Sequence, residues 1–164
     1  MAMSLRARFM TLGLSVAFVA LVADQVSKWW ILEHVMKPPR VIPVTDFFNL
    51  VMVWNRGVSF GLFNTPGSSA WVLTGLALAL TAFLLVWLWR ADGHRLALAL
   101  GLIIGGALGN VVDRVRFGAV ADFLDFYVGN WHWPAFNVAD SAITVGVVIL
   151  ILDSLFQRPE NTDT

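Results

Sequence analysis

The sequence predicts an all-α membrane protein with a small β element: four transmembrane helices that carry a short sheet at one membrane surface. Hydrophobic residues make up 58% of the 164 residues and charged residues only 13%, proportions outside the range of soluble domains. Four apolar segments are each long enough to cross about 30 Å of hydrocarbon as a helix. Because no water is present there to satisfy an open backbone, each segment must be helical. We expect a single integral membrane domain over residues 1–164.

The first predicted helix covers residues 9–32, and its start resembles a secretory signal peptide. Arg6 and Arg8 precede a largely apolar run, as they would in such a leader. Leu21, however, stands where a cleavage site needs a small residue, and hydrophobic residues resume after Asp24. We therefore expect a retained helix in which Asp24 and Lys28 lie one turn apart with the acid first, the favourable order for an ion pair.

The other helices are predicted over residues 70–89, 96–112 and 138–156, with tryptophans near their ends, as is typical of membrane boundaries. The third helix contains four glycines whose spacing lets a neighbouring helix approach closely. Packing within the chain is the favoured explanation, and docking of a substrate helix or a dimer contact is the alternative. The four are Gly101, Gly105, Gly106 and Gly109.

Two longer connections, residues 33–69 and 113–137, are expected to lie together at one membrane surface. Residues 41–54 are rich in Val, Phe, Ile and Thr and predict one or two short strands, followed by a turn at residues 55–57. Residues 120–128 predict a strand that enters a β-hairpin-like loop at Gly129-Asn130. These elements would form a β-sheet platform on the outer surface of the membrane.

Basic residues near the helix ends indicate the orientation only after motif residues are set aside. Five of the eleven lie on one side and six on the other, but three of the six, Lys28, Arg56 and Arg114, belong to motifs described below. Without these three, the positive-inside rule places both termini in the cytoplasm. The two longer connections are then extracytoplasmic.

The charge balance and the lack of cysteine exclude several functions. Eleven basic and eleven acidic residues give a formal net charge of zero, so nothing suggests a nucleic-acid partner. The absence of cysteine excludes disulfides, thiolate metal sites and a cysteine nucleophile. The three histidines fall in different connecting segments without ligand spacing, so we expect no metal site.

Four aspartates and an arginine gather beside the predicted membrane helices: Asp113, Arg114, Asp122, Asp125 and Asp140. Ionisable groups are costly at membrane depth unless they are buried, paired or wetted, so such a cluster indicates function. Arg114 has a guanidinium fork suited to holding a carboxylate or backbone carbonyls.

Each charged motif also has a purely structural explanation. Asp24 with Lys28 is compatible with an interfacial ion pair at a helix end, and Asp113 with Arg114 with an interfacial charge cluster. Asn137-Val-Ala-Asp140 matches a capping box at the start of the fourth helix.

Two of the aspartates lie in unlike environments. Asp122 is flanked by Val, Ala, Phe and Leu, an apolar setting that would raise its pKa, whereas a helix N-terminus favours negative charge on Asp140. Such a pair can activate a water and protonate a leaving amine. A serine mechanism is disfavoured because Ser27, Ser59 and Ser141 lack a suitably spaced base.

Five motifs together resemble the bacterial lipoprotein signal peptidases, the signal peptidase II family. The resemblance covers essentially the whole chain, with the motifs in order and at the expected spacing. Departures are small: Ser27, Ala121 and Trp133 replace residues more usual in the family, and none is a carboxylate. The motifs are Asp24-Gln-Val-Ser-Lys28, Asn55-Arg-Gly-Val-Ser-Phe60, Gly109-Asn-Val-Val-Asp-Arg114, Val120-Ala-Asp-Phe123 and Pro134-Ala-Phe-Asn-Val-Ala-Asp-Ser141.

The resemblance implies an aspartic endopeptidase of the bacterial cytoplasmic (inner) membrane that is multi-pass and active at the extracytoplasmic face. Its substrate would be a prolipoprotein whose cysteine carries a diacylglyceryl group, cleaved on the N-terminal side of that cysteine. It further implies no cofactor, membrane lipid as a partner, and a monomer. By the same resemblance the catalytic residues are Asp122 and Asp140, and the residues that shape the site or hold substrate are Asp24, Lys28, Asn55, Gly57, Asn110, Arg114 and Asn137.

Two other classes of function are compatible with the composition. A small proton- or ion-coupled transporter subunit would also carry acids and a basic residue in the membrane, although it would place them near the midplane in broken helices. A noncatalytic assembly factor would use the glycine face of the third helix.

Overall fold

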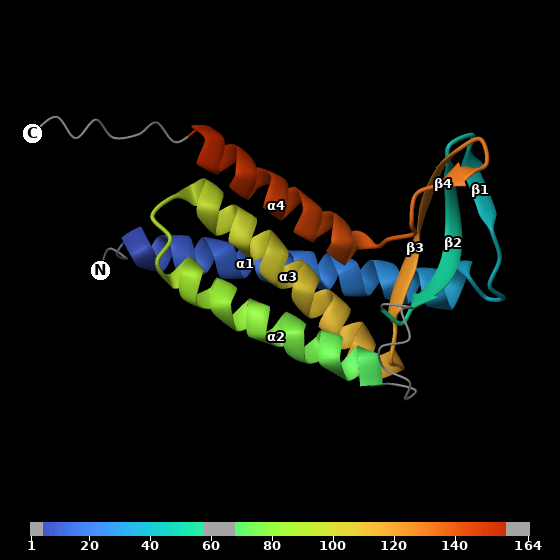
Figure 1. Cartoon of the computed structure of the whole chain (residues 1–164), viewed down its shortest axis with the longest axis horizontal. Coiled ribbons are helices and arrows are strands. Elements are labelled where there is room, and N and C mark those ends of the chain that lie inside the picture. The colour runs from blue at the N-terminus through green and yellow to red at the C-terminus, as the bar shows by residue number, and fades with distance from the viewer. Residues whose placement is uncertain (1–4, 58–67, 157–164) are drawn as a thin grey trace, which may run out of the picture.

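The computed structural model describes residues 5–57 and 68–156, in which four long helices lie side by side with an antiparallel sheet at one end (Figure 1). All four helices are long and apolar enough to cross a membrane. The start of α1 and the end of α4 lie at the end of the bundle opposite the sheet (Figure 1). The helices are α1 (Leu5–Trp30), extended by the π-helical turn η1 (Ile31–Val35), α2 (Ser68–Trp89), α3 (His94–Phe117) and α4 (Val138–Phe156).

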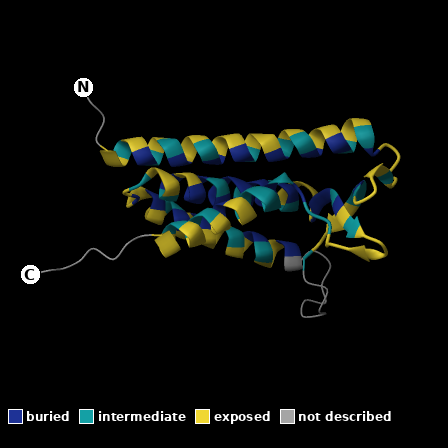
Figure 2. Ribbon diagram, turned by 90° about the horizontal axis from the view of Figure 1, so that it is seen from above, coloured by how far each residue is buried: buried dark blue, intermediate teal, exposed yellow. Residues whose placement is uncertain are grey.

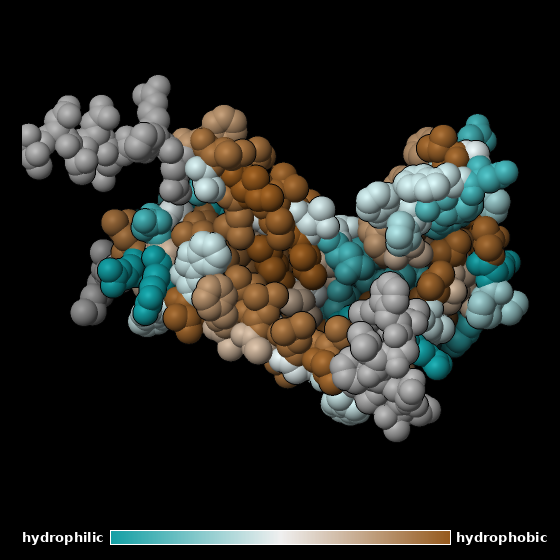
Figure 3. Space-filling model, in the orientation of Figure 1, coloured by the Kyte–Doolittle hydropathy of each residue, from teal (hydrophilic) through white to brown (hydrophobic). Residues whose placement is uncertain are grey.

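α3 is the central helix of the bundle. Within the most apolar stretch of each span, 72% of the residues of α3 are buried inside the protein, against 28% for α1, 22% for α2 and 11% for α4. α1 turns one buried stripe towards the bundle and exposes its other face (Figure 2). On the face seen in Figure 3, hydrophobic residues cover most of the helical part, as expected of helices that face lipid.

Glycines of α3 let both α1 and α4 approach it closely. A Cβ added at Gly105 would lie 2.4 Å from the backbone oxygen of Ala17 in α1, and one at Gly106 would lie 2.4 Å from that of Ala139 in α4. No side chain larger than hydrogen fits at such separations. The glycine face is therefore used for packing within the chain, as predicted.

The sheet confirms the strands and the hairpin predicted from the sequence. Its order is β1-β2-β3-β4, all antiparallel, and β3 and β4 are joined by the predicted turn at Gly129 and Asn130. A bulge in β2 between Leu50 and Val53 brings Val53 opposite Asp122. The strands are β1 (Ile42–Thr45), β2 (Phe48–Asn55), β3 (Val120–Val128) and β4 (Trp131–His132).

The segment between β4 and α4 folds back onto β3. The N–H groups of Phe136 and Leu124 each donate to the other residue's carbonyl, at 3.0 and 2.9 Å. This bridge fixes the chain immediately before α4 against the middle of β3. It thereby sets Asn137 beside Asp122.

Several helix boundaries differ from the prediction, most of all the end of the third helix. The sequence predicts that it ends at residue 112, but α3 continues to Phe117 and stops at Gly118, whose φ of 68° is the left-handed conformation typical of a glycine cap. Asp113 and Arg114 therefore lie on α3 rather than in the following connection. α1 begins before residue 9 and, with η1, passes residue 32; α2 and α3 each begin two residues early, and α4 has the predicted bounds.

Candidate active site

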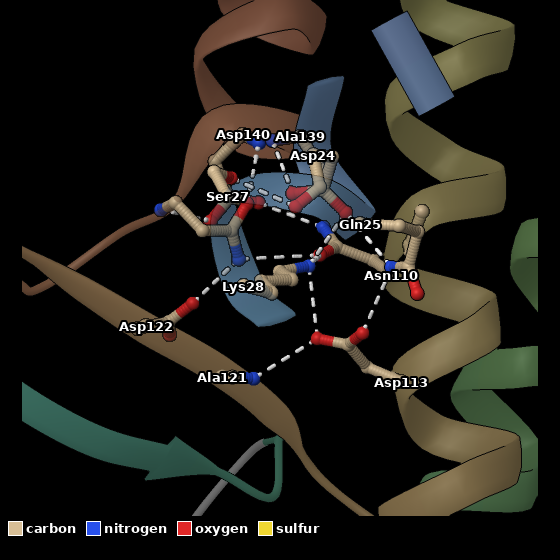
Figure 4. Close-up of polar contacts among 12 residues, drawn as sticks. Asp24, Gln25, Ser27, Lys28, Asn110, Asp113, Ala121, Asp122, Ala139 and Asp140 are labelled. Atoms are coloured by element: carbon tan, nitrogen blue, oxygen red, sulfur yellow. Dashed lines mark hydrogen bonds and ion pairs between the residues drawn. The ribbon is translucent and has the colours of Figure 1, made fainter. Parts of the chain in front are cut away.

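Polar side chains converge where the sheet-side ends of α1, α3 and α4 meet β3 (Figure 4). Lys28 of α1 lies at the centre of an ionic cluster, with its Nζ 2.8 Å from Asp24 Oδ2 and 2.8 Å from Asp113 Oδ2. All three residues are buried. Asp24 and Lys28 are thus not merely an interfacial ion pair at a helix end, because their charges are enclosed and shared with α3.

Asp24 joins three helices. Its Oδ1 accepts a hydrogen bond from the backbone N–H of Ala139 in α4 at 2.9 Å. A Cβ added at Gly109 of α3 would lie 2.5 Å from Asp24 Oδ2, so this glycine makes room for the carboxylate. The position of Asp24 therefore depends on the close approach of α1 to α3.

Gln25, which the sequence did not identify as a site residue, holds the same cluster from α1. Its Nε2 lies 3.1 Å from Asp24 Oδ2, 3.2 Å from the carbonyl oxygen of Gly109 and 3.0 Å from Asp113 Oδ1. Asp113 in turn accepts the backbone N–H of Ala121 at 3.1 Å. Asp113 thereby fixes β3 to α3 next to Asp122.

Asn110 of α3 relays the ionic cluster to Asp140. Its Oδ1 accepts hydrogen bonds from Lys28 Nζ and from Asn137 Nδ2, both at 3.2 Å, and its Nδ2 donates to Asp140 Oδ1 at 2.8 Å. The opposite amide orientation would point the NH₂ group at an ammonium and the carbonyl oxygen at a carboxylate. The cluster therefore determines which way Asn110 presents its donor.

Asn137 connects the two predicted catalytic aspartates. Its Nδ2 donates to Asp122 Oδ1 at 2.7 Å. The predicted capping box is confirmed, because the N–H of Asp140 donates to Asn137 Oδ1 at 3.0 Å and the N–H of Asn137 donates to Asp140 Oδ2 at 3.2 Å. One residue thus touches a carboxylate on β3 and a carboxylate on α4, while capping the helix that carries the second.

Asp122 is buried, with an exposed fraction of 1%. Desolvation raises its pKa to about 6, the charge of Asp140 acts in the same direction, and hydrogen bonds from Asn55 and Asn137 oppose the rise. The sequence-based expectation for this residue is confirmed.

The remaining predicted site residues lie at the margin of this network. Arg114 is half-buried, donates to the carbonyl oxygen of Asn110 at 3.3 Å and interacts electrostatically with Asp140 and Asp122. Asn55 accepts the N–H of Gly57 at 2.9 Å, and Gly57 has a φ of 88°, which confirms the predicted turn. The rest of that motif, Val58-Ser59-Phe60, lies outside the described residues.

Asp125 belongs to a different cluster. Its carboxylate accepts from Asn49 Nδ2 at 2.9 Å and lies 2.9 Å from His132 Nδ1, which ties β2, β3 and β4 together. Burial raises its pKa, but these two partners outweigh that effect and hold it below the usual value. Asp125 shares none of these partners with Asp122, and it stabilises the sheet.

The serine alternatives find no support among the described residues. Ser27 Oγ donates to the carbonyl oxygen of Asp24 at 2.8 Å and Ser141 Oγ donates to that of Asn137 at 2.9 Å, so each hydroxyl bonds to its own local backbone. Over residues 5–57 and 68–156, no group of three or more His, Asp or Glu side chains is arranged to hold a metal ion.

Comparison with known proteins identifies the family of the chain. The family model described as Signal peptidase (SPase) II matches residues 16–156. The chain belongs to the signal peptidase II family. A protein named lipoprotein signal peptidase from Methylorubrum extorquens (strain PA1) is 49% identical over 157 residues, 93% of this chain and 90% of that protein. Another, from Burkholderia mallei (strain SAVP1), is 46% identical over 145 residues, 87% of this chain and 86% of that protein.

The fold is shared with a solved structure described as a bacterial membrane enzyme. The two superimpose with a TM-score of 0.72 at 28% identity, over 93% of this chain and 92% of that one. As a member of the signal peptidase II family, the protein is a multi-pass membrane peptidase of the aspartic class that removes signal peptides in lipoprotein maturation. The comparisons lend no support to the transporter alternative.

Proposed function

We propose that Asp122 and Asp140 are the catalytic pair of this signal peptidase II. The observation that carries the proposal is the position of Asn137, which is hydrogen-bonded to both carboxylates. Asp122 is supplied by β3 and Asp140 by α4, so neither element could form the pair alone. Two carboxylates in unlike surroundings satisfy the requirement for one base and one acid in the same site.

The pair can cleave a peptide bond with one water molecule and no other reactant. One carboxylate takes a proton from the water as its oxygen attacks the scissile carbonyl carbon, and a tetrahedral intermediate forms. The other carboxyl group donates a proton to the amide nitrogen as the C–N bond breaks. The products are a carboxylate on the signal peptide and an amino group on the mature chain. The proton that remains on the first carboxyl group can return to the second, so the pair regains its starting state.

The other predicted site residues position this pair. Asp24 pairs with Lys28, Lys28 donates to Asn110, and the Asn110 amide donates to Asp140. Arg114 brings a positive charge beside both carboxylates, where it can stabilise the negative charge that develops on the substrate. Asn55 donates to Asp122, and the turn at Gly57 holds Asn55 in place.

The substrate we propose is a prolipoprotein with a diacylglyceryl-modified cysteine, cleaved on the N-terminal side of that cysteine. A cavity of about 410 Å³ opens beside Asp140 and is lined mainly by apolar groups of Trp133, Phe136 and Val145. A hollow separates the helices from the sheet in the surface view (Figure 3). An acyl chain and a signal-peptide helix could both reach such a site from within the bilayer.

We further propose that both termini are cytoplasmic and that the sheet and active site face the extracytoplasmic side of the bacterial inner membrane. The charge distribution of the connecting segments supports this orientation. Surrounding membrane lipid would then contact α1, α2 and α4, and a single copy would carry the complete site as one domain. Every side chain assigned to the pair and its support belongs to one chain.

The test is cleavage of a lipid-modified prolipoprotein by wild type, Asp122→Asn and Asp140→Asn in detergent, followed on a gel. Asparagine keeps the size of the side chain but is neither an acid nor a base, so each variant should lose at least about 10³-fold in rate. Asp125→Asn is the matched control on the same strand and should retain most activity. Thermal unfolding and circular dichroism verify that each variant is folded. Full activity in either folded site variant would refute the pair.

A further inference from the structure

A second cavity, of about 290 Å³, lies away from the apolar cavity beside Asp140 and between α1, α3 and β2. Its lining includes Gln25, Lys28 and Asp113 of the ionic cluster, whose polar contacts are drawn in Figure 4. Its mouth carries Lys37 and Arg116. None of the catalytic chemistry proposed above uses these two basic residues.

Aromatic side chains place the mouth of this cavity at headgroup depth. Trp29 is at the end of α1 and 54% exposed, Phe117 is the last residue of α3 and 44% exposed, and Trp54 of β2 is 41% exposed. Exposed aromatic rings at the ends of membrane helices favour the boundary between hydrocarbon and water. A ligand in this cavity would therefore lie beside lipid headgroups rather than in bulk solvent.

The charges at the cavity leave one cation available. Lys28 is neutralised by Asp24 and Asp113, and Lys37 pairs with Glu33. The Arg116 guanidinium lies 4.8 Å from the centre of the Phe117 ring, and within the described part of the chain it forms an ion pair with no carboxylate. A guanidinium held against a ring keeps its hydrogen-bond donors for an anion in the plane of the fork.

We propose that this cavity binds the phosphate group of a membrane phospholipid, with Arg116 as its ligand. A phosphodiester suits the two-pronged guanidinium, and the acyl chains of the lipid would descend along the exposed faces of Trp29 and Leu32. The diacylglyceryl group of a lipoprotein has no phosphate, so this site is distinct from the substrate site.

A lipid bound in this cavity would contact residues that position the catalytic pair. Lys28 and Asp113 line the cavity, and Lys28 also donates to Asn110, which donates to Asp140. The lipid is therefore expected to contact the support of the catalytic pair without contacting substrate.

Native mass spectrometry of the delipidated whole protein in detergent, titrated with dioleoylphosphatidylglycerol, tests the proposal. Arg116→Gln should weaken binding about tenfold, the loss expected for one charge-assisted contact, and Arg116→Lys should retain part of it. Arg8→Gln, an exposed arginine at the opposite end of α1, is the matched control and should bind as wild type does. Thermal unfolding of each variant verifies folding.

Two competitors distinguish the sources of the ligand. Dioleoylglycerol has the same acyl chains without phosphate, and inorganic phosphate has the anion without chains; neither should displace the phospholipid at equal concentration. Equal lipid binding by wild type and Arg116→Gln would overturn the proposal, as would displacement by either competitor. The readout is binding, so failure of this site would leave the assignment of Asp122 and Asp140 untouched.

Discussion

The side chain of Asn137 uses all of its hydrogen-bonding groups inside the site. Both protons of Nδ2 are donated, one to Asp122 and one to Asn110, and Oδ1 accepts the N–H of Asp140. The residue is completely buried. An aspartate at this position would set a third carboxylate against Asp122, and an alanine would leave several buried groups without partners. The structure thus explains why an amide, and no other side chain of this size, fits here.

Asp122 illustrates how an active-site charge lowers stability. Its pKa is raised to about 6 from an ordinary value of 3.8, so the folded state binds this proton more tightly than the unfolded state does. The stabilising contribution is fully present below about pH 4 and is lost as the pH rises through about 6. The corresponding free energy is at most about 3 kcal/mol.

Asp122→Asn should therefore be more stable than wild type at pH 7.5, because the amide remains neutral and still accepts hydrogen bonds. The difference should shrink and vanish by about pH 4, where the carboxyl group is protonated as well. Thermal unfolding in detergent across this pH range measures it. A variant less stable than wild type at pH 7.5 would contradict the burial argument.

Lys28 should be far more important to stability than Lys37, although each pairs with an acid one turn away. Lys28→Met leaves Asp24 and Asp113 as buried, unpaired carboxylates, and a loss of about 3–5 kcal/mol is expected. Lys37→Met, at an ion pair whose lysine side chain is 63% exposed, should cost less than about 1 kcal/mol. Chemical denaturation of both variants makes the comparison, and equal losses would show that the buried cluster is not ionic.

Among the elements, α3 depends most strongly on glycine. Gly105→Ala would place a Cβ 2.4 Å from a backbone oxygen of α1, which neither helix can relieve by a side-chain rotation. We expect a loss of about 1–3 kcal/mol from overpacking. Gly75→Ala on α2, where a Cβ meets nothing within 4 Å, should be neutral or slightly stabilising. Thermal unfolding of the two variants compares a close helix contact with an open surface.

The elements also show where sequence reasoning succeeds. The strands and the hairpin were predictable because residue preference and turn chemistry are local, and the bounds of α4 because a capping box marks its start. The end of α3 was missed because Asp113, Arg114 and Arg116 interrupt the hydrophobic run that defines a membrane segment. The charge of Asp113 is accommodated by Lys28 of α1, a partner on another element that no local pattern reveals. Gly118 was the available local signal.

The site was predictable to a similar degree. The prediction missed a residue whose partners lie far away in the sequence. The resemblance to signal peptidase II named Asp122, Asp140 and Asn137, which the structure brings together. Gln25 was not identified, although its amide lies within hydrogen-bond distance of groups on both α1 and α3. An uncharged amide next to Asp24 in the sequence gives no indication of a partner 88 positions away.

At the scale of the whole molecule, the proposed orientation can be tested because the chain has no cysteine. Single cysteines at Asn130, in the exposed hairpin turn, and at Asp92, in the exposed turn between α2 and α3, lie at opposite ends of the bundle. In intact cells with a permeable outer membrane, an impermeant maleimide should label Asn130→Cys and spare Asp92→Cys until the inner membrane is opened. The reverse pattern would invert the proposed topology.

The enclosure of α3 also bears on how the protein is made. The sheet-side end of α3 carries Asn110 and Asp113, whose partners Lys28 and Gln25 belong to α1. Because translation produces α1 first, those partners are already in the bilayer when α3 leaves the ribosome. Without α1, the polar end of α3 should rise towards the headgroups, so that a cysteine at Asn110 becomes reactive to an impermeant maleimide. α1 would then act as an insertion partner for the helix that later holds the active site.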